Sequence, residues 1–162
     1  MRVPLAAFDP AHAPTVASWA VGDDVVRAWC ALEGDAVPAD VVAGWSKADD
    51  VEAFVYGDPG DAPVAYGELW LDDEEGEVEL ARLLVAPERR GRGVGRALVT
   101  ALVEQARRAH PELPAVILRV RPENGQAIRA YAAAGFVAVP ADEQAEWNRG
   151  QRFDYHWMVL PA

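Results

Sequence analysis

Apolar and polar residues alternate along several stretches of the chain, and a period of two predicts β-strands. The predicted strands span residues 2–8, 51–56, 63–71, 77–85, 115–120, 136–139 and 152–160. Pro4 places the first strand at an edge of the sheet, because proline cannot donate a ladder hydrogen bond. The stretch 115–120 is almost wholly apolar, which predicts a central strand that is buried on both faces.

Other stretches repeat their apolar residues with the period of a helix. The predicted helices span residues 10–20, 23–32, 38–46, 93–109 and 125–134, and the polar stretch 140–150 is predicted to be a flexible loop. The strand–helix–strand unit over 77–120 makes its two strands parallel. Within 77–85, the alternation predicts that five side chains share one face of the strand: Glu77, Glu79, Ala81, Leu83 and Val85.

A glycine-rich stretch, RRGRGVGR at 89–96, joins the strand 77–85 to the helix 93–109. Glycines at alternate positions let the backbone approach a ligand closely, and the first helical turn presents unpaired N–H groups with partial positive charge. This pattern predicts an anion site that suits phosphate, and the alternative is a solvated loop before a core helix. The stretch matches neither the P-loop, which needs a lysine, nor the Gly-x-Gly-x-x-Gly fingerprint of dinucleotide sites.

Composition narrows the class of protein. With a formal net charge of −11, the chain is a poor partner for nucleic acid, and its field favours a cationic substrate. No apolar run approaches the roughly 20 residues that cross a bilayer, and the N-terminus lacks a signal-peptide pattern, so we expect no membrane partner and a cytoplasmic location. We expect one domain over residues 1–162. Cys30 is the only cysteine, and we expect it to pack as a small apolar residue rather than to act as a nucleophile.

Two motifs carry a resemblance to a known family, and the second follows the first at the distance expected for that family. The first is RGRGVG at 90–95, which follows a strand and fits the pattern Arg/Gln-x-x-Gly-x-Gly/Ala. The second is LRV at 118–120 followed by N-x-x-A-I-x-x-Y-x-x-x-G-F at 124–136. Together they resemble the acyl-CoA pyrophosphate loop and the next strand and helix of the GNAT superfamily of N-acetyltransferases. The resemblance covers about residues 64–139.

The resemblance implies a GNAT-like α/β (α+β) fold, with a mixed, mostly antiparallel sheet of about six or seven strands and helices on both faces. It also implies that strands 77–85 and 115–120 diverge at their C-terminal ends, where acetyl-CoA binds as a co-substrate and no metal is needed. The residues implied to bind it are Leu83, Leu84, Val85, Arg90, Gly91, Arg92, Gly93, Val94, Gly95, Arg96, Asn124, Ala127 and Tyr131.

The resemblance also assigns catalytic roles. Asn124 and Tyr131 are seven residues apart, so they share a helix face, and Tyr131 is implied to protonate the leaving thiolate. The alternative for this tyrosine is a packing role. Glu79 is the candidate base for the amine, with His156 as a weaker candidate and ordered water left open. Some relatives carry a base glutamate on the next strand, where this chain has Arg119.

The implied activity is transfer of an acetyl group from acetyl-CoA to a primary amine. We expect direct attack, because no cysteine or serine lies in a nucleophile motif. Three alternatives stay open: transfer of another acyl group or acylation of a hydroxyl, a non-catalytic sensory module that binds acyl-CoA, and a nucleotide-binding interaction domain. The acceptor, a small-molecule or protein amine, is not specified, and we expect a monomer or a homodimer. Trp19, Trp29 and Trp45 either line a substrate pocket or anchor the core.

Overall fold

One seven-stranded sheet runs through the molecule in the order β1-β2-β3-β4-β5-β7-β6. The structure, a computed structural model, describes residues 4–162. The strands are β1 (Leu5–Ala7), β2 (Val51–Tyr56), β3 (Ala65–Asp72), β4 (Glu77–Val85), β5 (Ala115–Val120), β6 (Val137–Ala138) and β7 (His156–Val159). β4 and β5 are parallel and every other neighbouring pair is antiparallel, which confirms the predicted mixed sheet.

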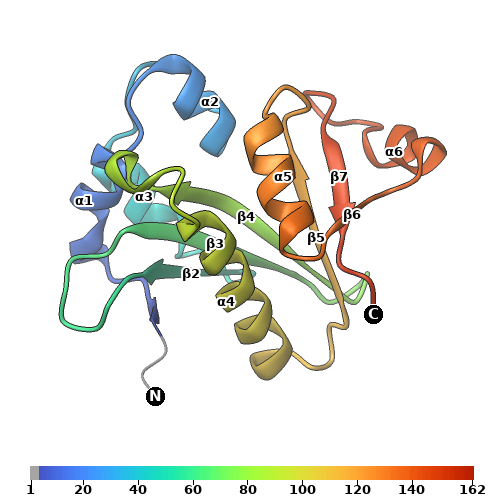
Figure 1. The fold of residues 1–162 in the computed structure, drawn as a ribbon, viewed down its shortest axis with the longest axis horizontal. Coiled ribbons are helices and arrows are strands. Elements are labelled where there is room, and N and C mark those ends of the chain that lie inside the picture. The colour runs from blue at the N-terminus through green and yellow to red at the C-terminus, as the bar shows by residue number, and fades with distance from the viewer. Residues whose placement is uncertain (1–3) are drawn as a thin grey trace.

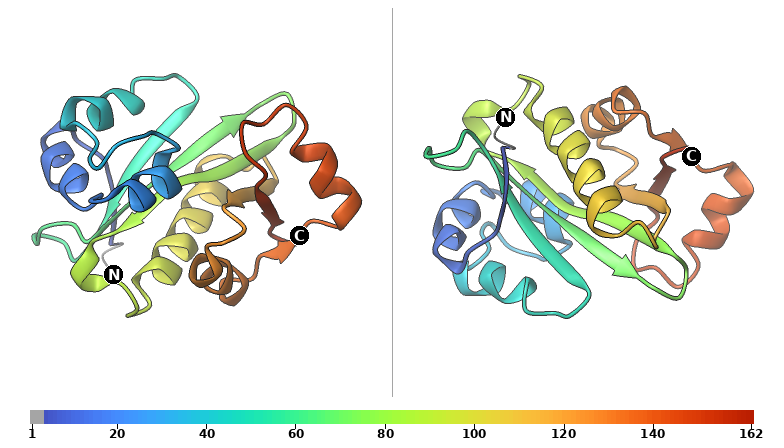
Figure 2. Two further views of the ribbon diagram at one scale, coloured as in Figure 1. Left: turned by 90° about the horizontal axis from the view of Figure 1, so that it is seen from above. Right: turned by 90° about the horizontal axis from the view of Figure 1, so that it is seen from below.

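The helices cover both faces of this sheet, as predicted (Figure 1). They are η1 (Pro10–His12), α1 (Ala13–Ser18), α2 (Asp23–Cys30), α3 (Ala39–Trp45), η2 (Pro87–Arg89), α4 (Val94–Ala109), α5 (Gly125–Ala133) and α6 (Ala141–Trp147). Figure 2 shows α1, α2 and α3 on one side of the sheet and α4 on the other. Within residues 4–162, no helix combines the length and the apolar character needed to cross a membrane.

Two apolar clusters fix these helices to the sheet. α4 and α5 pack on one face, where Leu80 and Leu118 from the parallel strands are almost fully buried. α1, α2 and α3 pack on the other face, where Val26 and Val42 are fully buried. Burying one such side chain contributes about 1.5–3 kcal/mol, so both layers are held mainly by the hydrophobic effect.

A bulge in β4 reverses its side-chain alternation. The pairing with β3 slips by one residue, so that Arg82 and Leu83 together face Gly67. Arg82 has a φ of +49°, a left-handed conformation that side-chain-bearing residues rarely adopt. Beyond the bulge, Leu83 and Val85 pack in the α4 cluster with Leu80. The predicted common face for residues 77–85 is therefore wrong past the bulge.

Residues 141–147 form α6, so the prediction of a flexible loop here is wrong. Two side-chain amides tie this helix to the last strand. Gln144 Nε2 donates to the Trp157 carbonyl, and the Trp157 amide donates to Gln144 Oε1, each at 2.8 Å. Asn148 exchanges an equivalent pair of bonds with the backbone of Tyr155 at 2.9 Å. The segment is polar because its polar side chains satisfy the backbone beside it.

The terminal strands are shorter than the pattern predicts. β1 is an edge strand, as Pro4 indicated, and the Pro4 carbonyl accepts a hydrogen bond from the amide of Gly57 at 3.0 Å. Residues 2–3 of the predicted strand lie outside the described residues. The last strand begins at His156, because the chain before it is bonded to Asn148 of the α6 turn.

Candidate active site

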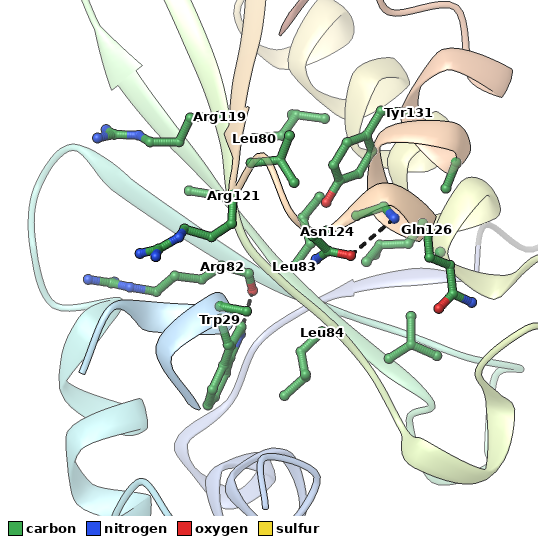
Figure 3. A pocket seen from close by; sticks show the side chains of 18 of the residues that line it. Trp29, Leu80, Arg82, Leu83, Leu84, Arg119, Arg121, Asn124, Gln126 and Tyr131 are labelled. Carbon is green, nitrogen blue, oxygen red and sulfur yellow. Dashed lines mark hydrogen bonds between the residues drawn. The ribbon is translucent and has the colours of Figure 1, made fainter. Parts of the chain in front are cut away.

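The two parallel strands separate halfway along their length, as expected. Their pairing runs from Glu77–Ala115 to Leu80–Leu118 and then stops, while β4 continues to Val85. The other edge of β5 pairs with β7 along residues 117–120. A cavity of about 830 Å³ occupies this fork, lined by residues of α2, β4, the glycine-rich loop and α5 (Figure 3). The fork therefore places an open strand edge beside the predicted anion site.

β4 presents free backbone groups to the fork. The amide of Ala86 donates to the carbonyl of Val64 at 2.8 Å, which turns the backbone of Val85 away from β3. Leu83 lies in the bulge and lines the cavity, whereas the backbone of Leu84 faces β3 and only its side chain lines the cavity. Of the three residues predicted to pair with pantetheine, Val85 thus has its backbone amide directed away from β3.

The glycine-rich loop opens α4 without any side-chain cap. Gly91 and Gly93 have φ angles of +74° and +81°, which glycine adopts without strain. A Cβ built on either glycine would meet no atom within 4 Å, so the space above this backbone is open. The first-turn amides of α4 therefore have no intrahelical partner and face an open cradle, an arrangement that suits an anion.

Some residues of the predicted phosphate loop line the cavity, and others do not. Gly91, Gly93, Gly95 and Arg96 line the cavity with Arg90, whereas Arg92 and Val94 are not among the described lining residues. The guanidinium of Arg90 is already committed to the protein. Its Nε donates to the Val85 carbonyl at 3.0 Å and its Nη2 to the Trp19 carbonyl at 3.3 Å. Arg90 therefore anchors the loop to the end of β4.

α5 brings a phenol and a side-chain amide to the opposite wall of the cavity. Asn124 caps the helix, since its Oδ1 accepts from the amide of Ala127 at 3.3 Å, and its Nδ2 remains a donor. In Figure 3 the hydroxyl of Tyr131 points into the cavity, beside Asn124 and Leu83. Burial raises the pKa of Tyr131 to about 12, so this phenol is protonated at neutral pH.

Glu79, the predicted base, is paired with Arg119 across the two parallel strands. Its two carboxylate oxygens accept from Arg119 Nε at 2.7 Å and from Nη2 at 3.0 Å, and its side chain is 12% exposed. Burial disfavours the guanidinium charge, but the bonds to Glu79 outweigh it and raise the pKa of Arg119. Both residues line the cavity; His156 is not among the lining residues in the described part of the chain.

A buried carboxylate beneath the cavity was not predicted from the sequence. Glu68 is fully buried and accepts hydrogen bonds from the Tyr66 hydroxyl, from Trp70 Nε1 at 2.8 Å and from Arg82 Nη1 at 3.0 Å. Burial and the charge of Glu68 raise the pKa of Tyr66. Trp29 Nε1 donates to the Arg82 carbonyl at 2.8 Å. This network holds the strained bulge from both sides.

Replacing Glu68 with leucine is expected to lower the free energy of unfolding by about 3–5 kcal/mol, because it leaves a buried guanidinium and two other donors unpaired. Urea unfolding would measure the change. Glu104→Leu, at an exposed position on α4, is the control and should change stability by about 0.5 kcal/mol or less. A loss below about 1 kcal/mol for Glu68→Leu would contradict the structural role of this network.

Trp29 and Cys30 lie on the α2 side of the cavity. Trp29 is 6% exposed and serves the core and the cavity wall together, whereas Trp19 is a core residue. The thiol of Cys30 donates to the Val26 carbonyl at 3.3 Å, and burial raises its pKa, so it is not a thiolate at neutral pH. No group of three or more potential metal ligands occurs within residues 4–162.

Several solved acetyltransferase structures have a similar fold. An aminoglycoside acetyltransferase in complex with coenzyme A and kanamycin matches with a TM-score of 0.71 and 21% identity, over 98% of this chain and 94% of that chain. Spermidine N-acetyltransferase from Vibrio cholerae, in complex with CoA and spermine, matches with a TM-score of 0.72 and 18% identity, over 96% and 93%. Ribosomal-protein-alanine N-acetyltransferase from Brucella melitensis matches with a TM-score of 0.70 and 21% identity, over 98% of this chain and 99% of that chain.

The forked sheet of this chain thus belongs to a fold that these acetyltransferases share. The model of the acetyltransferase (GNAT) family matches residues 17–136, which is most of the chain. The protein belongs to this family. The matched range extends the resemblance toward the N-terminus, where α1, α2 and α3 cover the sheet.

Proposed function

We propose that this protein transfers an acetyl group from acetyl-CoA to a primary amine. The observation that carries the proposal is the composition of one cavity, which joins free strand amides, an uncapped helix N-terminus and a protonated phenol. These are a hydrogen-bonding edge for a polar chain, a cradle for a diphosphate and a proton donor for a leaving group. Family membership supports the same activity.

Successive parts of the cavity suit successive parts of acetyl-CoA. The first-turn amides of α4 and the open backbone at Gly91 and Gly93 suit its diphosphate. The backbone amide of Val85, with Asn124 Nδ2, suits its amide-containing arm. When bound, the co-substrate supplies an acetyl group activated as a thioester.

The proposed reaction moves two protons, one from the amine and one to the sulfur. The amine nitrogen bonds to the acetyl carbon and loses a proton, while the carbon–sulfur bond breaks and the sulfur takes a proton. Tyr131 donates that second proton, because its phenol is protonated and points into the cavity. A β4 backbone amide at the bulge, near Leu83 and Leu84, is the proposed donor to developing charge on the acetyl oxygen.

Glu79 is the proposed acceptor of the amine proton, directly or through water. A carboxylate has about four lone-pair sites, and Arg119 occupies two of them, so Glu79 retains the capacity to accept. Glu79→Gln is expected to lower kcat/KM by about 100-fold and to change the acid limb of its pH profile. The measurement is thiol release from acetyl-CoA between about pH 6 and pH 10.

Glu77→Gln is the matched control for this variant, because Glu77 is on the same strand but is not among the described lining residues. Its pH profile should match that of the unchanged protein. If Glu79→Gln also leaves the profile unchanged, ordered water is the base, with acetyl transfer itself unaffected. His156 pairs with Val120 of β5 but is not among the described lining residues, so it stays the weaker candidate.

The proposed activity is tested by calorimetry followed by turnover. CoA should bind, whereas ATP and NAD should not, and thiol release should appear with at least one primary amine. CoA binding without turnover on any amine would favour the non-catalytic sensory module instead. ATP or NAD binding with indifference to CoA would overturn the proposal. Comparing acetyl-CoA with longer acyl-CoA thioesters would identify the transferred group.

A further inference from the structure

Three arginines form one wall of the cavity. Arg82 comes from β4, Arg119 from β5, and Arg121 follows β5 directly, and all three line the cavity. Figure 3 shows their side chains side by side, with the guanidinium groups directed to the same side. They are only 20% to 25% exposed. This arginine wall lies on the side of the fork away from the glycine-rich loop.

Aromatic rings fix the guanidinium groups of the arginine wall. The Cζ of Arg82 lies 4.2 Å from the ring centre of Trp45 and 5.0 Å from that of Trp70. The Cζ of Arg121 lies 4.2 Å from the ring centre of Phe153. A guanidinium that stacks by its face keeps its N–H bonds in its own plane, where a carboxylate can bind them in pairs. The guanidinium groups of the wall are therefore preorganised to bind a planar anion.

Arg121 has donor capacity that the protein does not use. Its Nε donates to Glu123 at 3.1 Å, but its Nη1 is buried and has no hydrogen-bond partner within residues 4–162. A buried N–H group without a partner is costly and rare in folded proteins. An acceptor oxygen of a ligand would satisfy it once a small shift of the Arg121 side chain exposes this nitrogen to the cavity. The orphaned nitrogen is thus a candidate contact for a ligand oxygen.

The carboxylates near the wall are already occupied by arginines. Glu79 binds Arg119 with both oxygens, and the fully buried Glu68 binds Arg82. On α2, Asp23 pairs with Arg27, whereas Asp24 is fully exposed and lies 3.9 Å from Arg27 Nη1. A polycationic acceptor needs carboxylates free of such partners, and the described wall presents free guanidinium N–H groups instead.

The net charge of −11 favours cations at long range, but it does not decide the binding in the cavity. Exposed charges are screened beyond about 8–10 Å at physiological salt, whereas a guanidinium in the cavity wall acts at contact distance. The local charge therefore decides which group is held beside the thioester.

We propose that the acceptor is a primary amine that also carries a carboxylate, and that Arg121 with Arg82 binds the carboxylate while the amine faces Tyr131. The proposal rests on the proposed acetyl transfer. In the reaction the amine nitrogen bonds to the acetyl carbon and the carbon–sulfur bond breaks. The carboxylate of the acceptor takes no part and stays on the product. Amino acids are the smallest compounds of this class.

Thiol release from acetyl-CoA should be measured on matched pairs of amines. The panel contains α-amino acids and ω-amino acids, each with its carboxamide, together with spermidine and kanamycin. At least one acid is expected to exceed its own amide by about tenfold or more in kcat/KM, because the amide loses a charge-assisted bond to arginine. Equal rates for acids and amides, or turnover of spermidine or kanamycin alone, would overturn the proposal.

Arg121→Gln should raise the KM for the preferred acid by about tenfold or more and abolish the preference over its amide. The CoA affinity should stay unchanged, which separates acceptor binding from cofactor binding. Arg152→Gln is the matched control, because Arg152 stacks on the same Phe153 at 5.0 Å but is 63% exposed and is not among the described lining residues. It should leave KM unchanged.

The outcomes distinguish this inference from the proposed function. CoA binding without turnover of any amine overturns both. Turnover of amines with no preference for a carboxylate leaves acetyl transfer intact and overturns this inference alone. Weaker CoA binding in Arg121→Gln, with the ratio of acid to amide unchanged, would assign the arginine to the cofactor and also overturn it.

Discussion

Replacing Gly93 with valine is expected to abolish CoA binding. Gly93 has a φ of +81°, a conformation that costs an L-residue about 1–2 kcal/mol, and its missing Cβ leaves open the space over the α4 amides. Losing two charge-assisted hydrogen bonds of about 1.5–3 kcal/mol each corresponds to about 100-fold or more in Kd. Calorimetry with CoA provides the measurement.

The control for this experiment is Gly60→Val. Gly60 has a φ of +89°, and a Cβ there would also meet no atom within 4 Å, but it lies in the turn between β2 and β3. Its substitution carries the same backbone strain and should leave CoA affinity unchanged. Equal CoA affinities for Gly93→Val and the unchanged protein would remove the glycine-rich loop from the cofactor site.

Tyr131→Phe is expected to lower kcat by about 100-fold or more while CoA affinity changes by less than about twofold, because it removes one oxygen, the proposed proton donor. Burial raises the pKa of this phenol to about 12, so it stays protonated as the pH rises from 7 to 10. The kcat of the unchanged protein should therefore show no decline over that range from loss of the acid.

Tyr56→Phe is the matched control, since Tyr56 is a partly buried tyrosine of the same apolar cluster but is not among the described residues that line the cavity. It should keep kcat. A Tyr131→Phe variant that also keeps kcat would end the assignment of the phenol as acid and leave a packing role. A fall of both kcat and CoA affinity would indicate that the hydroxyl positions the co-substrate.

The local parts of the site could be predicted from the sequence because their geometry is set by short spacings. Alternate glycines before a helical pattern specify an uncapped N-terminus, and seven residues specify that Asn124 and Tyr131 share a helix face. Both residues line the same cavity. The parallel strand pair followed from one strand–helix–strand unit in the same way.

The features that depend on distant partners could not be predicted. The bulge at Arg82 arises from the pairing of β4 with β3 and is held by Glu68 and Trp29, so no local pattern marks it. The arginine wall likewise depends on which strands are neighbours in space. α6 is a different case, because Pro140 followed by acidic residues in the first turn is a helix-start signal that the polar composition obscured.

The fork has a mechanical consequence for the sheet. Within residues 4–162, four residue pairs of the β4–β5 ladder join the β1–β4 half of the sheet to the half formed by β5, β7 and β6, and this ladder ends at Leu80. A molecule that lies in the fork and bonds to β4 on one side and to α5 on the other bridges the two halves where strand pairing is missing. Filling the site would thus add a connection between the two halves beyond the one that the shared apolar cluster provides, and make their opening motions more cooperative.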